Sequence, residues 1–260
     1  MEVLKSLPVC LQVSKKDYTF PKEHRTVKVI PLDWVRIIVD TADTRLRLFI
    51  LLTLNCGFGA SEIGQLDKGA YDPVEGRITR KRCKTRKSAN APTVCYKLWN
   101  ITREFLEQEV ENCKKYPQNP MYSGLLLVNT NGKPLWYAYV ADGKTRKNTS
   151  IADAFEKLIK KLRTSHSDMP TITYNQFRRT SATLIDNERQ YKMFNGLWLA
   201  HASRSMADKH YNTDDDTVLD ECVAWLHDKI FGEESLSKRG NVKMGCMGYD
   251  WATFRVWARV

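Results

Sequence analysis

Apolar residues recur at the spacing of a helix along most of this chain. The most apolar segment covers residues 46–54, where Asp43 or Thr44 can cap the helix and residues 55–59 end it. Similar patterns predict further helices over residues 31–38, 61–66, 101–115, 151–162, 175–185, 191–199, 203–210 and 218–230. The chain is therefore predominantly helical.

Strand-like runs are few and short. Residues 77–83 and 93–96 predict two strands joined by a polar loop, and residues 125–128 predict a third, followed by a tight turn. Residues 142–150 are polar and basic, which predicts a loop. We therefore expect a mainly α fold with a small antiparallel β-sheet, in the α+β class.

Three parts of the chain differ in amino-acid composition. Residues 1–30 form an N-terminal extension of mixed character, residues 31–231 form the main domain, and residues 232–260 form a glycine-containing tail. Four aromatic residues lie close together in that tail: Tyr249, Trp251, Phe254 and Trp257. An exposed tail of this composition would associate non-specifically through its aromatic side chains. We therefore expect it to dock on its own chain or on a neighbouring copy.

Charge narrows the choice of partner. The formal net charge is +11 over 260 residues, and the pI is about 9.3. This balance favours an anionic partner, with double-stranded DNA first. One basic cluster lies between residues 77 and 87 without an acidic residue: Arg77, Arg80, Lys81, Arg82, Lys84, Arg86 and Lys87. It is either a solvated hairpin or, as we favour, a ribbon that contacts DNA phosphates.

The cysteine pattern and the hydropathy argue against disulfide-rich, zinc-binding, membrane-spanning and secreted proteins. The seven cysteines are scattered and include no Cys-x-x-Cys pair, which argues against a disulfide framework and against a zinc site. We expect no metal and no cofactor. No apolar run is long enough to span a membrane, and no secretory leader is visible. The expected location is cytoplasmic, in association with DNA.

The richest chemistry lies between residues 173 and 211. Thr173 is a candidate N-cap for a helix that carries Arg178 and Arg179, and His201 and Tyr211 follow. Successive helical residues point about 100° apart, so only one of the two arginines can face a site, and the register favours Arg178. Arginine, histidine and tyrosine suit the attack of a phenol on a phosphodiester held by cations.

This order of residues resembles the catalytic half of the tyrosine site-specific recombinases, the phage integrase family. The matching residues are Asn175-x-x-Arg178, Leu199-Ala200-His201 and Tyr211, against the family's His-x-x-Arg, Leu-Gly-His and nucleophilic Tyr. Upstream, residues 56–63 resemble the family's Thr-Gly-Leu-Arg-x-x-Glu-Leu box. Residues 31–231 then correspond to the catalytic domain, without the helical DNA-clamping domain that usually precedes it.

The resemblance implies DNA strand cleavage and rejoining through a covalent 3′-phosphotyrosine, as in site-specific recombination or the integration of a mobile element. Tyr211 would be the nucleophile, Arg178 and His201 would bind the phosphate, and Lys84 would be the general acid. Asn175 stands where His or Lys is usual. A homo-oligomer on DNA, a dimer or a tetramer, is the expected assembly.

One position of the box departs from the family. Glu62 matches the acidic residue and would orient its neighbours, but Gly59 stands where the first catalytic arginine belongs. An arginine of the basic hairpin, Arg80, Arg82 or Arg86, or a partner chain, could replace it. Two alternatives stay open: a catalytically impaired DNA-binding relative with an architectural or regulatory role, and a type IB topoisomerase relative.

Overall fold

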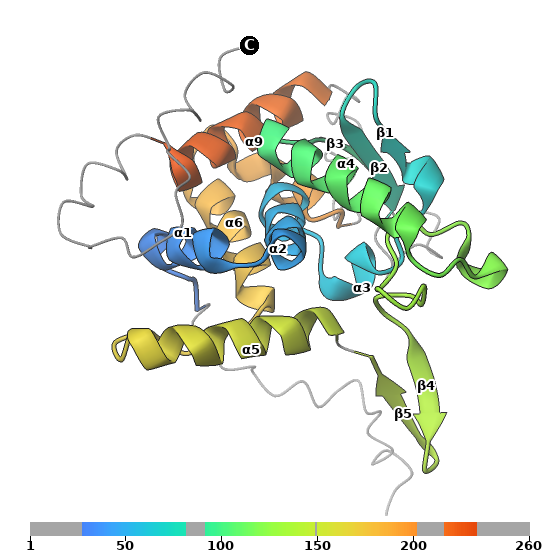
Figure 1. Cartoon of the computed structure of the whole chain (residues 1–260). Coiled ribbons are helices and arrows are strands. Elements are labelled where there is room, and N and C mark those ends of the chain that lie inside the picture. The colour runs from blue at the N-terminus through green and yellow to red at the C-terminus, as the bar shows by residue number, and fades with distance from the viewer. Residues whose placement is uncertain (1–27, 82–91, 149, 202–215, 233–260) are drawn as a thin grey trace, which may run out of the picture.

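The computed structural model describes residues 28–81, 92–148, 150–201 and 216–232 (Figure 1). The described helices are α1 (Leu32–Thr41), α2 (Thr44–Cys56), α3 (Ala60–Ile63), α4 (Asn100–Lys115), α5 (Ser150–Ser165), α6 (Asn175–Asn187), α7 (Asn195–Trp198) and α9 (Asp216–Phe231). Short 3-10 turns are η2 (Lys68–Ala70), η3 (Pro120–Tyr122) and η4 (Lys192–Phe194). The strands are β1 (Tyr71–Asp72), β2 (Arg77–Lys81), β3 (Thr93–Lys97), β4 (Ala138–Ala141) and β5 (Lys144–Lys147). The expected class, mainly helical with small antiparallel sheets, is confirmed.

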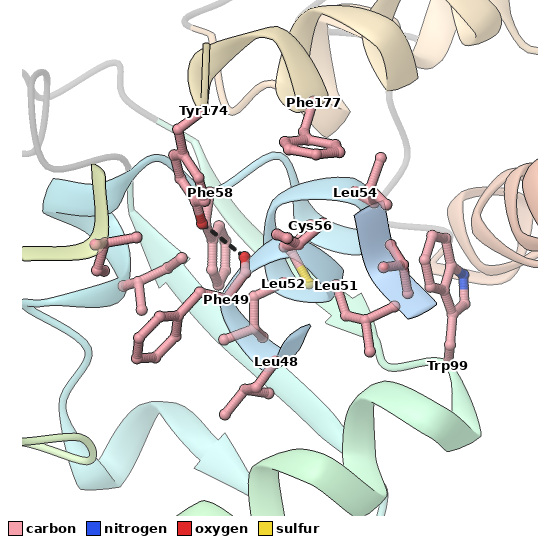
Figure 2. Packing of buried hydrophobic residues seen from close by; sticks show 14 of the residues in the cluster. Leu48, Phe49, Leu51, Leu52, Leu54, Cys56, Phe58, Trp99, Tyr174 and Phe177 are labelled. Carbon is pink, nitrogen blue, oxygen red and sulfur yellow. Dashed lines mark hydrogen bonds between the residues drawn. The ribbon is translucent and has the colours of Figure 1, made fainter. Parts of the chain in front are cut away.

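Helix α2 is the centre of the fold. The Asp43 side chain caps it by accepting a hydrogen bond of 2.9 Å from the Leu46 N–H, and Gly57 ends it in the left-handed region at φ 65°. Every residue from 48 to 56 is buried, so the helix is enclosed on all sides. Figure 1 shows α1, α4, α5, α6 and α9 arranged around it, and Figure 2 shows its leucines packed with Phe58, Trp99, Tyr174 and Phe177.

Buried hydroxyl groups fix α6 against α2. The Tyr174 hydroxyl donates to the Phe49 carbonyl at 2.7 Å and lies 2.7 Å from the Thr53 hydroxyl. The Ser181 hydroxyl donates to the Leu54 carbonyl at 3.0 Å. Because the polar atoms of this buried contact are satisfied, the two helices pack at one register, and the start of α6 is held beside the C-terminal end of α2.

The three-stranded sheet is antiparallel in the order β1-β2-β3, with Ile78 opposite Tyr96 and Arg80 opposite Val94. Ile78, Val94 and Tyr96 are buried, whereas Thr79 and Lys81 face outward. The sheet therefore shows the period-2 alternation of a half-buried layer.

Three local predictions were wrong. Residues 142–150 do not form a loop throughout, because β4 and β5 pair as a hairpin across Asp142 and Gly143, both with positive φ. Residues 125–128 contribute isolated bridges, to Asp67 and Pro134, and no strand. Residues 191–199 form the short pieces η4 and α7 instead of one helix.

Helix α6 also begins differently from the prediction. Tyr174 occupies the N-cap position, and Thr173 instead donates its N–H and its hydroxyl to the Gln176 side chain, at 2.6 and 3.0 Å. The predicted helix at 203–210 lies outside the described residues, as do residues 1–27 of the extension and residues 233–260 of the tail.

Within the described ranges, no helix combines the length and the apolar character that a membrane span requires.

Candidate active site

The site begins at the turn that follows α2. Gly57 reverses the chain, and its left-handed conformation lets Phe58 and Gly59 lead directly into α3. The Gly59 N–H donates to Glu62 Oε2 at 2.7 Å, which closes the first turn of α3. The Glu62 carboxylate is almost completely buried, with 7% of the residue exposed, so it requires cationic partners.

Arg178 is the first of those partners. It lies in the first turn of α6, and its Nη1 is 3.3 Å from Glu62 Oε2. Its Nη2 donates to the Leu199 carbonyl at 3.1 Å, so one guanidinium connects α3 with the segment that follows α7. Arg179, the next residue, is exposed. Of the two neighbouring arginines, Arg178 is the one that enters the site.

Arg80 is the second partner. Its side chain, 8% exposed, extends from β2 so that Nη2 lies 3.8 Å from Glu62 Oε1. Its Cζ lies 4.5 Å from the centroid of the Phe58 ring, which is cation-π geometry. Two guanidinium groups thus share one buried carboxylate, and the trio keeps one excess positive charge.

The segment around His201 borders the same region. The Tyr96 hydroxyl donates to the Trp198 carbonyl at 2.9 Å, and Trp198 Nε1 donates to the Asn55 carbonyl at 3.0 Å. Ala200 takes a left-handed φ of 50°, after which the His201 N–H donates to the Gly196 carbonyl at 2.9 Å. His201 itself is half-buried.

A small pocket joins these elements. Its lining residues come from α2, α3, β2, β3, α6 and the residues after α7: Cys56, Gly57, Phe58, Glu62, Arg80, Tyr96, Arg178, Leu199 and Ala200. Both arginines are in this lining, so an anion that enters the pocket meets two guanidinium groups.

Burial makes the Cys56 thiol and the Tyr96 phenol of the pocket lining unreactive. It raises the pKa of the Cys56 thiol and of the Tyr96 phenol far above their ordinary values, and the nearby Arg80 charge opposes this only weakly. The Tyr96 hydroxyl is also engaged with the Trp198 carbonyl. Neither group is therefore suited to act as the nucleophile at neutral pH.

The other expected site residues are dispersed. Asn175 is exposed at the start of α6, and Lys81 is exposed at the end of β2. Arg77 forms a two-pronged ion pair with Asp220 of α9, with Nη1 to Oδ1 at 3.0 Å. The remaining expected site residues lie outside the described part of the chain: Arg82, Lys84, Arg86, Lys87 and Tyr211.

The sequence prediction did not include Phe58 or Tyr96 among the site residues. Phe58 supports the Arg80 guanidinium, and Tyr96 packs edge-on against Phe58 with centroids 5.4 Å apart. The alternation along β3, which turns Val94 and Tyr96 inward, was the available signal for Tyr96. Within the described residues, no group of three or more His, Cys, Asp and Glu side chains could hold a metal ion.

The fold is that of tyrosine recombinase catalytic domains. The model of the family described as "Phage integrase family" matches residues 28–217, and the chain belongs to this family. No curated protein sequence matches the chain.

Solved structures show the same fold at low sequence identity. The Tn1549 transposon integrase in complex with transposon right end DNA has a TM-score of 0.57 and 14% identity, over 82% of this chain and 69% of that one. The same integrase with circular intermediate DNA has a TM-score of 0.56 and 15% identity, over 78% of this chain and 68% of that one. At these identities the likeness concerns the fold.

Proposed function

We propose that this chain cleaves and rejoins duplex DNA through a covalent 3′-phosphotyrosine formed at Tyr211. The observation that carries the proposal is the buried Glu62–Arg178 pair, which holds a guanidinium at a pocket next to the His201 segment. A preorganised guanidinium of this kind suits the extra negative charge of a phosphoryl-transfer transition state. Membership of the phage integrase family supports the same reaction.

The reaction needs no external energy source. The Tyr211 phenol oxygen forms a bond to the phosphorus while the bond to the 5′-oxygen of the next nucleotide breaks. The phenol proton passes to a base or to water, and the leaving 5′-oxygen takes a proton and becomes a hydroxyl. Because the phosphotyrosine keeps the energy of the ester, a 5′-hydroxyl can attack it and restore a phosphodiester.

Each candidate residue has a distinct role in this scheme. Arg178 binds the non-bridging oxygens through two donors, and His201 donates a hydrogen bond to the phosphate or assists the phenol proton. Lys84 protonates the leaving 5′-oxygen. Asn175 donates a hydrogen bond without charge, and Glu62 orients Arg178.

The basic hairpin and a second copy of the chain complete the proposal. Lys81, which is exposed, and the basic residues that follow it contact DNA phosphates. The Tn1549 transposon integrase was solved in complex with transposon right end DNA, which supports DNA as the partner. A homo-oligomer, dimer or tetramer, is proposed to assemble on that DNA.

Gly59 favours a second candidate, a relative that binds DNA without cleaving it. Glycine provides no cation, and the loss of one oxyanion donor typically lowers a rate by about 10²–10³-fold. This candidate predicts DNA binding with no covalent product.

The first prediction separates the two candidates. The full chain is incubated with a pool of nicked suicide duplexes of randomised sequence, and SDS-resistant protein–DNA adducts are isolated and sequenced. Wild type should form adducts, Tyr211→Phe should form none because it lacks the attacking hydroxyl, and Tyr137→Phe, at an exposed tyrosine, should match wild type. Retained DNA with no adduct, also on the sequences enriched by binding, would exclude the cleavage reaction.

A further inference from the structure

The alternation of β2 directs one basic residue of the hairpin into the site. Ile78 is completely buried, and Arg80, two residues later, points to the same face of the sheet. Thr79 and Lys81 point outward. Arg80 is thus separated by strand geometry from the solvent-facing Lys81 of the same basic cluster.

Arg80 is held on two sides after it enters the fold. The Phe58 ring supports its guanidinium at 4.5 Å, and Glu62 Oε1 lies 3.8 Å from its Nη2. A side chain that is 8% exposed, positioned by an aromatic face and a buried carboxylate, has lost most of its conformational freedom. Such a residue is preorganised, unlike a solvated lysine on a hairpin surface.

The geometry also relates Arg80 to Gly59. Gly59 donates its N–H to Glu62 Oε2, and a Cβ at this position would lie 3.0 Å from that same oxygen. A longer side chain at residue 59 would therefore enter the neighbourhood of Glu62, where Arg80 and Arg178 already meet. The Arg80 guanidinium, from β2, therefore reaches the same Glu62 carboxylate that a cationic side chain at residue 59 would reach.

We propose that Arg80 supplies the second guanidinium that binds the reacting phosphate, beside Arg178, and that Phe58 and Glu62 are its positioning residues. This inference rests on the proposed function. Both arginines line one small, open pocket, so a phosphate at its mouth would receive donors from β2 and from α6 at once. Two guanidinium groups compensate the charge that develops on the non-bridging oxygens, and residue 59 can be glycine without loss of the reaction.

The test compares Arg80 with Lys157, an exposed residue of α5, in the adduct assay. Arg80→Met keeps the unbranched stem over Phe58 and removes the charge, whereas Lys157→Met removes an equal charge from a surface outside the site. The expected adduct rate falls by about 10²–10³-fold in Arg80→Met. Lys157→Met should stay within about threefold of wild type. Arg80→Lys should remain well below wild type, since lysine cannot form the two-pronged contact.

A second variant pair addresses the position of the cation. Gly59→Arg added to Arg80→Met should raise the adduct rate at least tenfold above that of Arg80→Met alone, because it brings a guanidinium to Glu62 from the start of α3. Gly59→Arg alone should not exceed wild type. Circular dichroism and the thermal midpoint confirm that each variant is folded.

Inorganic phosphate provides a readout that does not depend on activity. In arginine side-chain NMR spectra, the Nε–H signals of Arg80 and Arg178 should shift together in wild type and in Lys157→Met as phosphate is added. A shift of Arg178 alone, or an Arg80→Met variant as active as Lys157→Met, overturns the role of Arg80 while leaving DNA cleavage intact. Absence of adduct from wild type overturns both proposals.

Discussion

At the scale of single residues, Ala200 shows how backbone geometry serves the site. Asp142 and Ala200 are the non-glycine residues with positive φ in the described part of the chain, and Ala200 directly precedes His201. The left-handed region costs a residue with a Cβ roughly 1–2 kcal/mol, so packing must impose it here. The bond from Arg178 to the Leu199 carbonyl is one of the contacts that hold this turn.

Ala200→Gly is therefore expected to stabilise the fold. Glycine relieves the strain. It also has more conformational freedom in the unfolded chain, which lowers the free energy of unfolding by about 0.4–1 kcal/mol. The net gain in the free energy of unfolding should be about 1 kcal/mol or less, measured by urea denaturation. Ala182→Gly inside α6 is the control and should lose about 1 kcal/mol. Equal losses in both variants would contradict a strained Ala200.

At the scale of elements, the β4–β5 hairpin differs from the rest of the fold. Its residues are exposed on both faces except for Ala141, which is partly buried, and Figure 1 shows it projecting from the helical body. The Asn148 N–H donates to the Tyr137 carbonyl at 2.8 Å, so the two ends of the hairpin are adjacent. The hairpin contributes no side chain to the described core.

Replacing residues 138–147 by two glycines should thus leave the thermal midpoint within a few degrees of wild type. The physical reason is that the only partly buried side chain lost is the small Ala141 and that the two ends are already joined by a hydrogen bond. Ile78→Ala in β2 is the contrasting variant, because Ile78 is fully buried and its truncation costs about 2–5 kcal/mol. A large fall in the midpoint of the shortened protein, measured by calorimetry, would mean that the hairpin supports the core.

At the scale of the whole molecule, the net charge of +11 predicts DNA binding that depends strongly on salt. Each phosphate contact contributes a slope of about −0.9 to the plot of log affinity against log salt. Neutralising Lys81, Arg82 and Arg86 together should reduce the slope by about 2–3 units if all three contact phosphates.

The control for this prediction removes the same charge from another surface. Lys157, Lys160 and Lys161 are exposed on α5, and their neutralisation should change the slope by less than about 1 unit. Fluorescence anisotropy on a labelled duplex measures both sets. Equal changes in the two triple variants would show that overall charge, and no basic ribbon, controls binding.

Local physical chemistry makes most of the helices predictable from the amino-acid sequence. The cap at Asp43 or Thr44, the break after residue 54 and the apolar character of α2 depend on residues within a few positions of one another. The structure confirms the apolar helix, with Asp43 as its cap and Gly57 at its end. The β4–β5 hairpin is not predicted because strands exposed on both faces lack alternating hydrophobicity, although Asp142-Gly143 is a typical hairpin turn.

Only the tertiary structure decided which residues meet. Glu62 and Arg178 are 116 positions apart, and Arg80 reaches them from a third element. The sequence allowed Arg80, Arg82 or Arg86 to enter the site. The pairing register of β2 with β3 brings Arg80 over Phe58, whereas Arg82 and Arg86 lie outside the described residues. Residue types and short-range order thus determined the family resemblance and the candidate chemistry. The position of the cations depends on the packing of α3, β2 and α6 around the buried end of α2, because long-range contacts leave no periodic signal in the chain.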